Sequence, residues 1–186
     1  MSQDSVLQVF REAGAILEGH FRLASGRHSG TYLEKFQVFQ HPQHTETLCR
    51  LIADHFRDAA PDLVAGPTTG GIILSYEVAR QLGLRGIFAE REGELRRFGR
   101  GFEVRPGERV LVVDDILTTG GSIRQVLDAV READGQPIGV AVLVDRTGGQ
   151  AAFDDLPFFA CLRLDIPSHD PGDCPLCRAQ VPLKVT

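Results

Sequence analysis

The stretch VLVVDDILTTGGS, residues 110–122, places four apolar residues directly before two acids and a run of Thr and Gly. An unbroken apolar run is typical of a strand that is covered on both faces, as in a parallel sheet. The glycines at its end predict a turn into a following helix. Ligands of open α/β sheets bind beyond the carboxyl ends of the strands, so we expect Asp114 and Asp115 to lie in a ligand-binding crevice.

The rest of the chain alternates between strand-like and helix-like patterns. Short runs rich in Val and Ile occur at residues 62–66, 85–90, 109–115 and 139–146. Apolar residues with helical spacing occur at residues 44–59, 70–83 and 120–135. Strands and helices that alternate with short connections predict one α/β domain over residues 1–186, with an open, mostly parallel twisted sheet flanked by helices.

Two segments fall outside this alternation. Residues 1–40 include GHFRLASGRHSGTYLEKF, a pattern that favours a hairpin with Gly-rich turns. Residues 90–104, EREGELRRFGRGFEV, are charged and contain several glycines and arginines. We expect this second segment to be a mobile loop or a hairpin arm rather than part of the core.

The composition is that of an ordinary globular protein. The chain has 186 residues, of which 42% are hydrophobic and 24% charged, and a formal net charge of -5. This acidic balance gives no reason to expect nonspecific binding to nucleic acid, because no excess of cations is available to displace phosphate counterions. No apolar run reaches the ~18 residues of a membrane span, and the start MSQDSVLQVF lacks the features of a signal peptide. We therefore expect a cytoplasmic protein with no nucleic-acid or membrane partner.

The four cysteines, Cys49, Cys161, Cys174 and Cys177, are too few and too scattered for a disulfide framework. The pair in CPLC has the two-residue gap of half a zinc site. No second such pair occurs, although His169 and Cys161 could complete a set of four ligands. The expectation from the sequence is a pair of reduced thiols in a C-terminal turn, with no role assigned to them.

Residues 118–122, TTGGS, offer backbone N–H groups, hydroxyls and a helix N-terminus. Together these groups form an anion site that needs no lysine. Paired acids would repel a phosphate unless a polyol lies between them or a Mg²⁺ is shared, and a ribose 5-phosphate meets both conditions. The alternative is that Asp115 caps a turn before an ordinary helix. The stretch matches neither the Walker A pattern nor the G-x-G-x-x-G fingerprint.

This stretch resembles the signature of the type I phosphoribosyltransferases, which bind 5-phosphoribosyl 1-pyrophosphate (PRPP). The resemblance implies that family's fold, with a small N-terminal hood formed by about residues 1–40. It implies that Asp114 and Asp115 hold the ribose hydroxyls and take part in catalysis. It also implies PRPP contacts along the rest of the stretch, at Ile116, Leu117, Thr118, Thr119, Gly120, Gly121 and Ser122.

Three further stretches resemble the orotate phosphoribosyltransferases: GAILEGHFRLASGRHS at residues 14–29, AGPTTGGIILSYEVARQLG at 65–83 and VLVDRTGG at 142–149. The resemblance assigns PRPP binding to Thr69 and Gly70 in the second stretch. It pairs Arg146 with the carboxylate of orotate and lets Thr118 touch the base. An arginine fork forms a bidentate, charge-assisted pair with a carboxylate, which uracil, adenine and guanine lack. The alternative is that Arg146 is a surface arginine beyond a strand end.

The sequence departs from the family in its lysines. Lysine occurs only at Lys35 and Lys184. Positions at which many members carry a lysine hold Ala24, Gly70 and, in the expected mobile loop, arginines.

The resemblance assigns the loop arginines a role in binding and catalysis. Arg91 best fits the position of the loop lysine, so it is expected to bind PRPP and to assist catalysis. Arg96 or Arg97 would supply further charge from the mobile loop. Arginine keeps the charge but does not transfer a proton, so we expect electrostatic help from this loop and no general acid. The alternative is an ordinary solvated run of charges.

The reaction implied is the transfer of the phosphoribosyl group from PRPP to orotate, which gives orotidine 5'-monophosphate and pyrophosphate in pyrimidine biosynthesis. Mg²⁺ is the implied cofactor, held mainly by PRPP with no direct protein ligand. The resemblance also implies a homodimer in which the loop serves the neighbouring subunit's site. Two alternatives stay open: a phosphoribosyltransferase for another nucleobase, and a non-catalytic regulator that senses PRPP.

Overall fold

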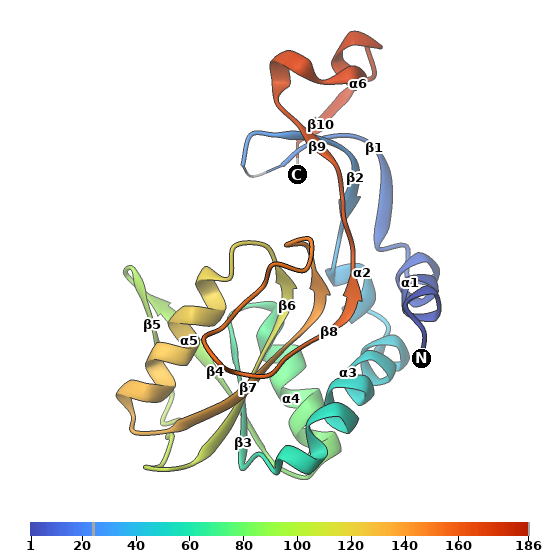
Figure 1. Ribbon diagram of the computed structural model, residues 1–186. Coiled ribbons are helices and arrows are strands. Elements are labelled where there is room, and N and C mark those ends of the chain that lie inside the picture. The colour runs from blue at the N-terminus through green and yellow to red at the C-terminus, as the bar shows by residue number, and fades with distance from the viewer. Residues whose placement is uncertain (24, 186) are drawn as a thin grey trace.

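Six strands form the central sheet of the structure, a computed structural model that describes residues 1–23 and 25–185 (Figure 1). Ala24 lies outside the described residues. The strands are β3 (Leu63–Pro67), β4 (Arg85–Glu92), β5 (Leu95–Phe98), β6 (Arg109–Leu117), β7 (Gln136–Asp145) and β8 (Phe158–Arg163), in the order β5-β4-β3-β6-β7-β8. All neighbours pair in parallel except β4 and β5, which are antiparallel. The open, mostly parallel sheet expected from the apolar runs is confirmed.

Helices cover both faces of this sheet because its strands are apolar on both sides. The helices of one face are α1 (Gln3–Glu12), α3 (Pro42–Phe56) and α4 (Gly70–Leu82), and α5 (Gly121–Glu132) packs on the other face. Strand β6 shows the alternation that makes this possible. Leu111 and Val113 belong to the first buried cluster, whereas Val110 and Val112 belong to the second. We call the sheet and these helices the body.

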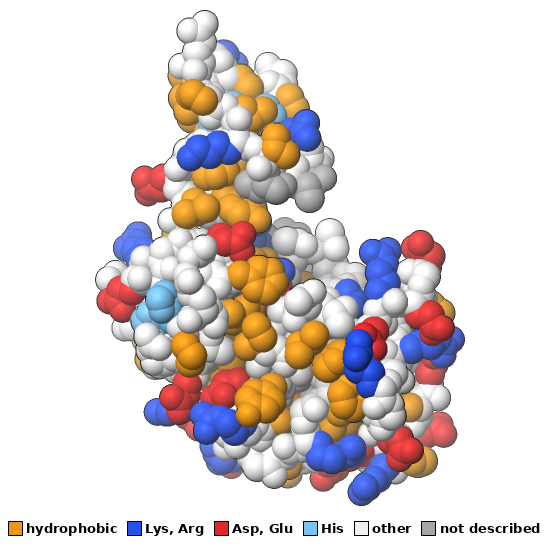
Figure 2. Space-filling model, turned by 180° about the vertical axis from the view of Figure 1, so that it is seen from behind, with side chains coloured by type: hydrophobic (Ala, Val, Ile, Leu, Met, Phe, Trp, Pro, Cys, Tyr) orange, Lys and Arg blue, Asp and Glu red, His pale blue; other side chains and the backbone are white. Residues whose placement is uncertain are grey.

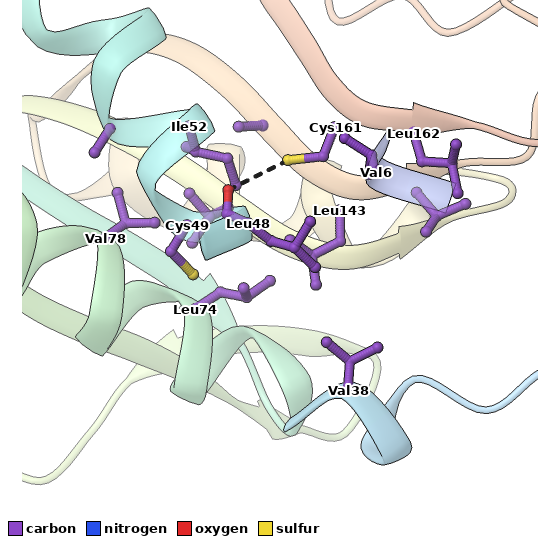
Figure 3. Packing of buried hydrophobic residues seen from close by; sticks show 14 of the residues in the cluster. Val6, Val38, Leu48, Cys49, Ile52, Leu74, Val78, Leu143, Cys161 and Leu162 are labelled. Atoms are coloured by element: carbon purple, nitrogen blue, oxygen red, sulfur yellow. Dashed lines mark hydrogen bonds between the residues drawn. The ribbon is translucent and has the colours of Figure 1, made fainter. Parts of the chain in front are cut away.

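The first cluster joins the helices of one face to the strands beneath them (Figure 3). It includes Leu48 of α3, Leu74 of α4 and Leu143 of β7, all essentially inaccessible to solvent. Cys161 of β8 is buried in the same cluster, and its Sγ donates a hydrogen bond to the Leu48 carbonyl at 3.5 Å. Cys161 is therefore a core residue, and the alternative in which it completes a metal site with the CPLC pair is wrong.

A second, four-stranded sheet projects from the body (Figure 1). Its strands are β1 (Ile16–Arg22), β2 (His28–Leu33), β9 (Ser168–His169) and β10 (Leu183–Val185), in the order β10-β1-β2-β9. The short helical turns η2 (Pro171–Asp173) and α6 (Pro175–Arg178) lie between the last two strands. We call the described part of residues 16–33 and 168–185 the hood.

The composition of the hood corrects the expectation that it is formed by about residues 1–40. The antiparallel β1–β2 hairpin is present as expected, but β10 pairs in parallel with β1 and β9 pairs antiparallel with β2. Both of these added strands come from the end of the chain. In addition, α1 packs its buried Val6 and Phe10 into the core of the body and is not part of the hood. Two strands of three and two residues carry too little periodic signal to be found in a sequence.

The charged segment after residue 90 forms an antiparallel hairpin of β4 and β5, which we call the arm (residues 89–98). On the face shown in Figure 2, acidic and basic side chains are interspersed over the body. Within residues 1–23 and 25–185, no helix has the length and apolar character needed to cross a bilayer.

Candidate active site

The acid pair, Asp114 and Asp115, lies at the carboxyl end of β6 with both side chains buried. Ser122 donates a hydrogen bond from Oγ to Asp114 Oδ2 at 2.8 Å, and the backbone N–H of Asp115 donates to Asp114 Oδ1 at 2.8 Å. Asp115 Oδ2 instead forms an ion pair with Lys35 Nζ at 2.9 Å. Consecutive strand residues point to opposite sides, so one acid faces the start of α5 and the other faces Lys35.

The environment of Asp114 disfavours its charged form. Burial, and next the negative charge of Asp115, raise the pKa of Asp114 to about 7. The hydrogen bonds from the Asp115 backbone and Ser122 oppose this shift but do not cancel it. A ligand that brings hydroxyl donors or positive charge to this carboxylate would therefore stabilise its ionised form near neutral pH.

Lys35 is a site residue that the sequence analysis did not assign. It lies two residues after the end of β2 and is the N-cap of the short helix α2 (Phe36–Phe39), so the end of the hood hairpin brings it to the acid pair. Its ammonium group also lies 5.5 Å from the centre of the Phe36 ring. The available signal was its rarity, because the chain has 20 cationic side chains and only two of them are lysines.

Residues 118–122 form the turn between β6 and α5. Gly120 adopts a left-handed φ of 79° as the N-cap of α5, and no side chain caps the helix. Its first-turn N–H groups therefore remain available to an anion, and the helix dipole favours negative charge at this end. Thr118 and Thr119 are exposed beside these groups.

Ile116 and Leu117, which the sequence analysis assigned to PRPP binding, have side chains that pack toward the core. The side chain of Leu117 lies in the second core cluster, and Ile116 packs against the first. The Ile116 N–H is used, because it donates to Asp115 Oδ1 at 2.6 Å. The Leu117 carbonyl is also used, because it accepts a hydrogen bond from the backbone N–H of Arg146 at 2.9 Å.

The turn between β3 and α4 lies directly against the acid pair. Thr69 is the exposed N-cap of α4, and Gly70 is its first residue. A side chain at Gly70 would overlap the Asp115 carboxylate, so only glycine fits at this approach. The structure thus brings together the two turns that the sequence assigned to PRPP.

The three arginines expected to act from the loop have different surroundings. Arg96 donates from Nη1 to Thr68 Oγ1 at 3.0 Å, and its Nε is buried with no hydrogen-bond partner among the described residues. Burial lowers the pKa of Arg96, while the charge of nearby Asp114 opposes that shift. Arg91 is exposed across the hairpin from Arg96 and donates to the Gly93 carbonyl at 3.1 Å.

Arg97 points away from the acid pair. It forms ion pairs with Glu92 of the arm at 3.1 Å and with Glu132, the last residue of α5, at 3.6 Å. Arg96 and Arg97 are neighbours in β5, so their side chains lie on opposite faces of the hairpin. The structure therefore places Arg96, but not Arg97, beside the site.

Arg146 follows β7 and lies on the side of the site that faces the hood. Its Nε is buried, and no hydrogen-bond acceptor for it occurs within the described part of the chain. Burial lowers the pKa of Arg146, and an interaction with Tyr32 of β2 acts in the opposite direction. A buried cationic nitrogen without a partner is costly, and an anionic group of a ligand would satisfy it. Tyr32 is a second residue of this region that the sequence analysis did not assign.

The arrangement defines a class of protein that holds a phosphorylated sugar at the carboxyl edge of a parallel sheet. Residues 36–165 match the family model described as the phosphoribosyl transferase domain. The chain belongs to the phosphoribosyltransferase family.

The curated relatives found within this family include orotate phosphoribosyltransferases. The chain is 52% identical over 184 residues to the orotate phosphoribosyltransferase of Heliobacterium modesticaldum, covering 98% of this chain and 96% of that one. It is 48% identical to that of Pelotomaculum thermopropionicum, covering 98% of this chain and 95% of that one.

Solved structures agree with this relationship. The orotate phosphoribosyltransferase of Aeropyrum pernix is 27% identical and superposes with a TM-score of 0.72, covering 86% of this chain and 93% of that one. The adenine phosphoribosyltransferase of Thermoanaerobacter pseudethanolicus, at 21% identity, has a TM-score of 0.62 and covers 72% of this chain and 88% of that one. That second likeness concerns the fold alone, so the fold does not distinguish the nucleobase.

Proposed function

We propose that this protein transfers the 5-phosphoribosyl group from PRPP to orotate, with release of pyrophosphate, as a step of pyrimidine biosynthesis. The observation that carries this proposal is the identity of 52% to an orotate phosphoribosyltransferase over nearly the whole chain. Arg146 supplies a physical reason for the choice of base, because its buried and unpaired nitrogen suits the carboxylate of orotate.

The sugar phosphate binds across the carboxyl end of β6. The ribose hydroxyls donate to Asp114 and Asp115, and the 5-phosphate accepts from the uncapped N–H groups at the start of α5. The turn at Thr69 and Gly70 lies on the other side of Asp115 and receives the pyrophosphate. Lys35 neutralises Asp115 in the free protein and places a positive charge where the pyrophosphate arrives.

Transfer breaks the bond between ribose C1 and the pyrophosphate oxygen and forms a bond from that carbon to a ring nitrogen of orotate, which gives up its proton to solvent. Positive charge develops on the sugar, and the leaving group takes the electron pair of the broken bond. The acid pair stabilises the sugar cation, while Lys35 and Arg96 stabilise the departing pyrophosphate. No side chain here needs to act as a nucleophile.

The two carboxylates of the acid pair suit a Mg²⁺ that is bound to PRPP when it enters the site. They suit an ion held by protein ligands alone less well. Lys35 already balances the charge of Asp115, and Asp114 already accepts hydrogen bonds from Ser122 and a backbone N–H, so the pair offers little unbalanced negative charge to a protein-held cation. Mg²⁺ also prefers phosphate oxygens and water. When bound with PRPP, the ion would neutralise the pyrophosphate.

We also propose a homodimer in which the arm of one subunit completes the site of the other. Arg91 is exposed on the arm and does not contact the acid pair of its own chain. Leu95 on the same arm is a large apolar side chain that is 49% exposed, which favours a contact with another surface.

The test is to incubate the protein with PRPP, Mg²⁺ and one nucleobase at a time, and to follow pyrophosphate release. We expect release with orotate and little with uracil, adenine, guanine or hypoxanthine. Pyrophosphate release with one of these other bases, and not with orotate, would show that the other base is the substrate. PRPP binding without release for any base would indicate a regulator that senses PRPP.

A further inference from the structure

Two histidines and two cysteines gather in the hood, outside the site described above. His20 comes from β1 and His28 from β2, while Cys174 is the N-cap of α6 and Cys177 lies within that helical turn. One potential ligand atom from each of the four lies within 4.8 Å of all the others. The cysteines and histidines in contact are about 150 residues apart in sequence, so the fold and not local sequence brings them together.

The separations between these atoms are those of ligands around one small ion. His20 Nε2 lies 3.0 Å from His28 Nδ1, 3.5 Å from Cys174 Sγ and 3.7 Å from Cys177 Sγ. Cys177 Sγ lies 3.3 Å from His28 Nδ1. Tetrahedral bonds of ordinary zinc length would place two nitrogens about 3.4 Å apart and a nitrogen and a sulfur about 3.6 Å apart.

The surrounding backbone orients these side chains for coordination. His20 Nδ1 lies 2.8 Å from the Val181 carbonyl oxygen, which only accepts, so Nδ1 carries the proton and Nε2 presents its lone pair to the cluster. The Arg178 N–H donates to the Cys174 carbonyl at 3.2 Å, and this turn brings the two thiols to one side. Metal-bound histidines commonly show such a bond from the second ring nitrogen.

The cluster lies in the hood, where Phe21 of β1 is buried but belongs to neither core cluster. His20, His28 and Cys174 are buried, whereas the two core clusters of the described residues reach into the hood only at Ile16 and Leu33. These two residues are paired at the body end of the hairpin. Burying two imidazoles without a strong partner is unfavourable, and a small sheet with so little apolar core needs another source of stability.

We propose that His20, His28, Cys174 and Cys177 bind one structural zinc ion that holds the hood together. Two sulfur and two nitrogen ligands in a tetrahedral arrangement suit zinc, and four protein ligands leave no position open for catalysis. The ion joins the hairpin near the start of the chain to the turn near its end. This site replaces the expectation of reduced thiols without a role, and its ligands are the two histidines of the hairpin rather than Cys161 and His169.

A zinc content measurement tests this proposal without any reference to orotate transfer. Protein produced with ample zinc should contain about one zinc per chain by elemental analysis. Replacement by Co²⁺ should give the visible spectrum of a tetrahedral site with thiolate ligands. Cys177→Ser and His28→Ala should each lower the zinc content to below about one tenth per chain.

His169→Ala is the matched control, because His169 pairs with His28 in the sheet but is not part of the cluster. It should keep the full zinc content and the Co²⁺ spectrum. Should a ligand variant fail to fold, titration of the intact protein with a thiol reagent still decides the matter: zinc should be released as Cys174 and Cys177 react. Wild-type protein without zinc and without a Co²⁺ spectrum, or with a disulfide between these cysteines, would overturn the proposal.

Discussion

Lys35 Nζ lies 2.9 Å from Asp115 Oδ2, and this ion pair connects the hood hairpin to the end of the central strand. Asp115 is almost fully buried, while Lys35 keeps about a third of its side-chain surface exposed. The lysine can therefore remain beside the acid in the free protein and still reach an incoming anion.

Replacing Lys35 should impair the reaction strongly. Lys35→Ala should lower kcat/KM by about 100-fold, because it removes a positive charge from the pyrophosphate position and leaves Asp115 without its partner. Lys184→Ala is the matched control, since Lys184 is the only other lysine and lies on the exposed strand β10. Steady-state pyrophosphate release would measure both. Equal activities of the two variants would exclude Lys35 from the site.

Replacing Arg146 should affect orotate and spare PRPP. Arg146→Ala should raise the KM for orotate by about 10- to 100-fold through the loss of a charge-assisted pair, with the PRPP dissociation constant nearly unchanged. Arg163→Ala, at the end of the neighbouring strand β8, is the control and should leave both constants unchanged. If binding of orotate and PRPP suffers equally, Arg146 does not recognise the base.

Arg96 and Arg97 should differ although they are adjacent. Arg96→Ala should lower kcat about 10- to 100-fold, because its guanidinium lies beside Thr68 and Asp114. Arg97→Ala should stay within about threefold of wild type, because Arg97 pairs with Glu92 of the arm and with Glu132 at the far end of α5, away from the acid pair. A larger loss of kcat for Arg97→Ala than for Arg96→Ala would mean that the arm presents its opposite face to the site when substrate binds.

A mixture of two inactive variants should test whether the arm is shared. Arg91→Ala alters the arm and Asp114→Asn alters the acid pair, so a mixed dimer would place both defects in one site and leave the other intact. Random mixing should then restore about a quarter of wild-type activity. Dimers whose arms serve their own sites would show no recovery, and a monomer in size-exclusion chromatography would contradict the proposed assembly outright.

The pKa of Asp114 predicts a dependence of stability on pH. Because the folded-state value of about 7 lies above that of the unfolded chain, the folded protein binds this proton more tightly. The resulting stabilisation is present below about pH 4 and is lost as the pH rises through about 7.

Urea unfolding of wild type and Asp114→Asn should reveal this dependence. Wild type should lose free energy of unfolding relative to the variant as the pH rises, by up to about 1.4 kcal/mol per pH unit. Asp128→Asn on the exposed side of α5 controls for the removal of one negative charge. A constant difference between wild type and Asp114→Asn from about pH 4 to about pH 8 would contradict the raised pKa.

The body and the acid pair could be predicted from the sequence because their signals are local. An apolar run that ends in two acids, followed by a Gly-rich turn, specifies both the strand and the place where a ligand binds. The choice between Arg96 and Arg97 needed one more step, since the period of two residues separates them only once the arm is known to be a hairpin.

The remaining parts depend on contacts between distant segments. Lys35 reaches Asp115 across 80 positions, and the zinc ligands come from opposite ends of the chain. The strands that unite those ends have only two and three residues, too few for any periodic pattern. Rarity of lysine and the spacing of CPLC were the only hints, and neither identifies its partner.

The hood combines strands from both ends of the chain, and this determines the order in which the parts of the protein can fold during synthesis. Strands β3 to β8 emerge before β9, α6 and β10, so the central sheet and its helices can become ordered while the hairpin of β1 and β2 still waits for its neighbours. The side of the crevice that carries Tyr32 and Lys35 is therefore the last to mature during synthesis. A nascent chain halted after β8 would therefore have an ordered body and an incomplete hood.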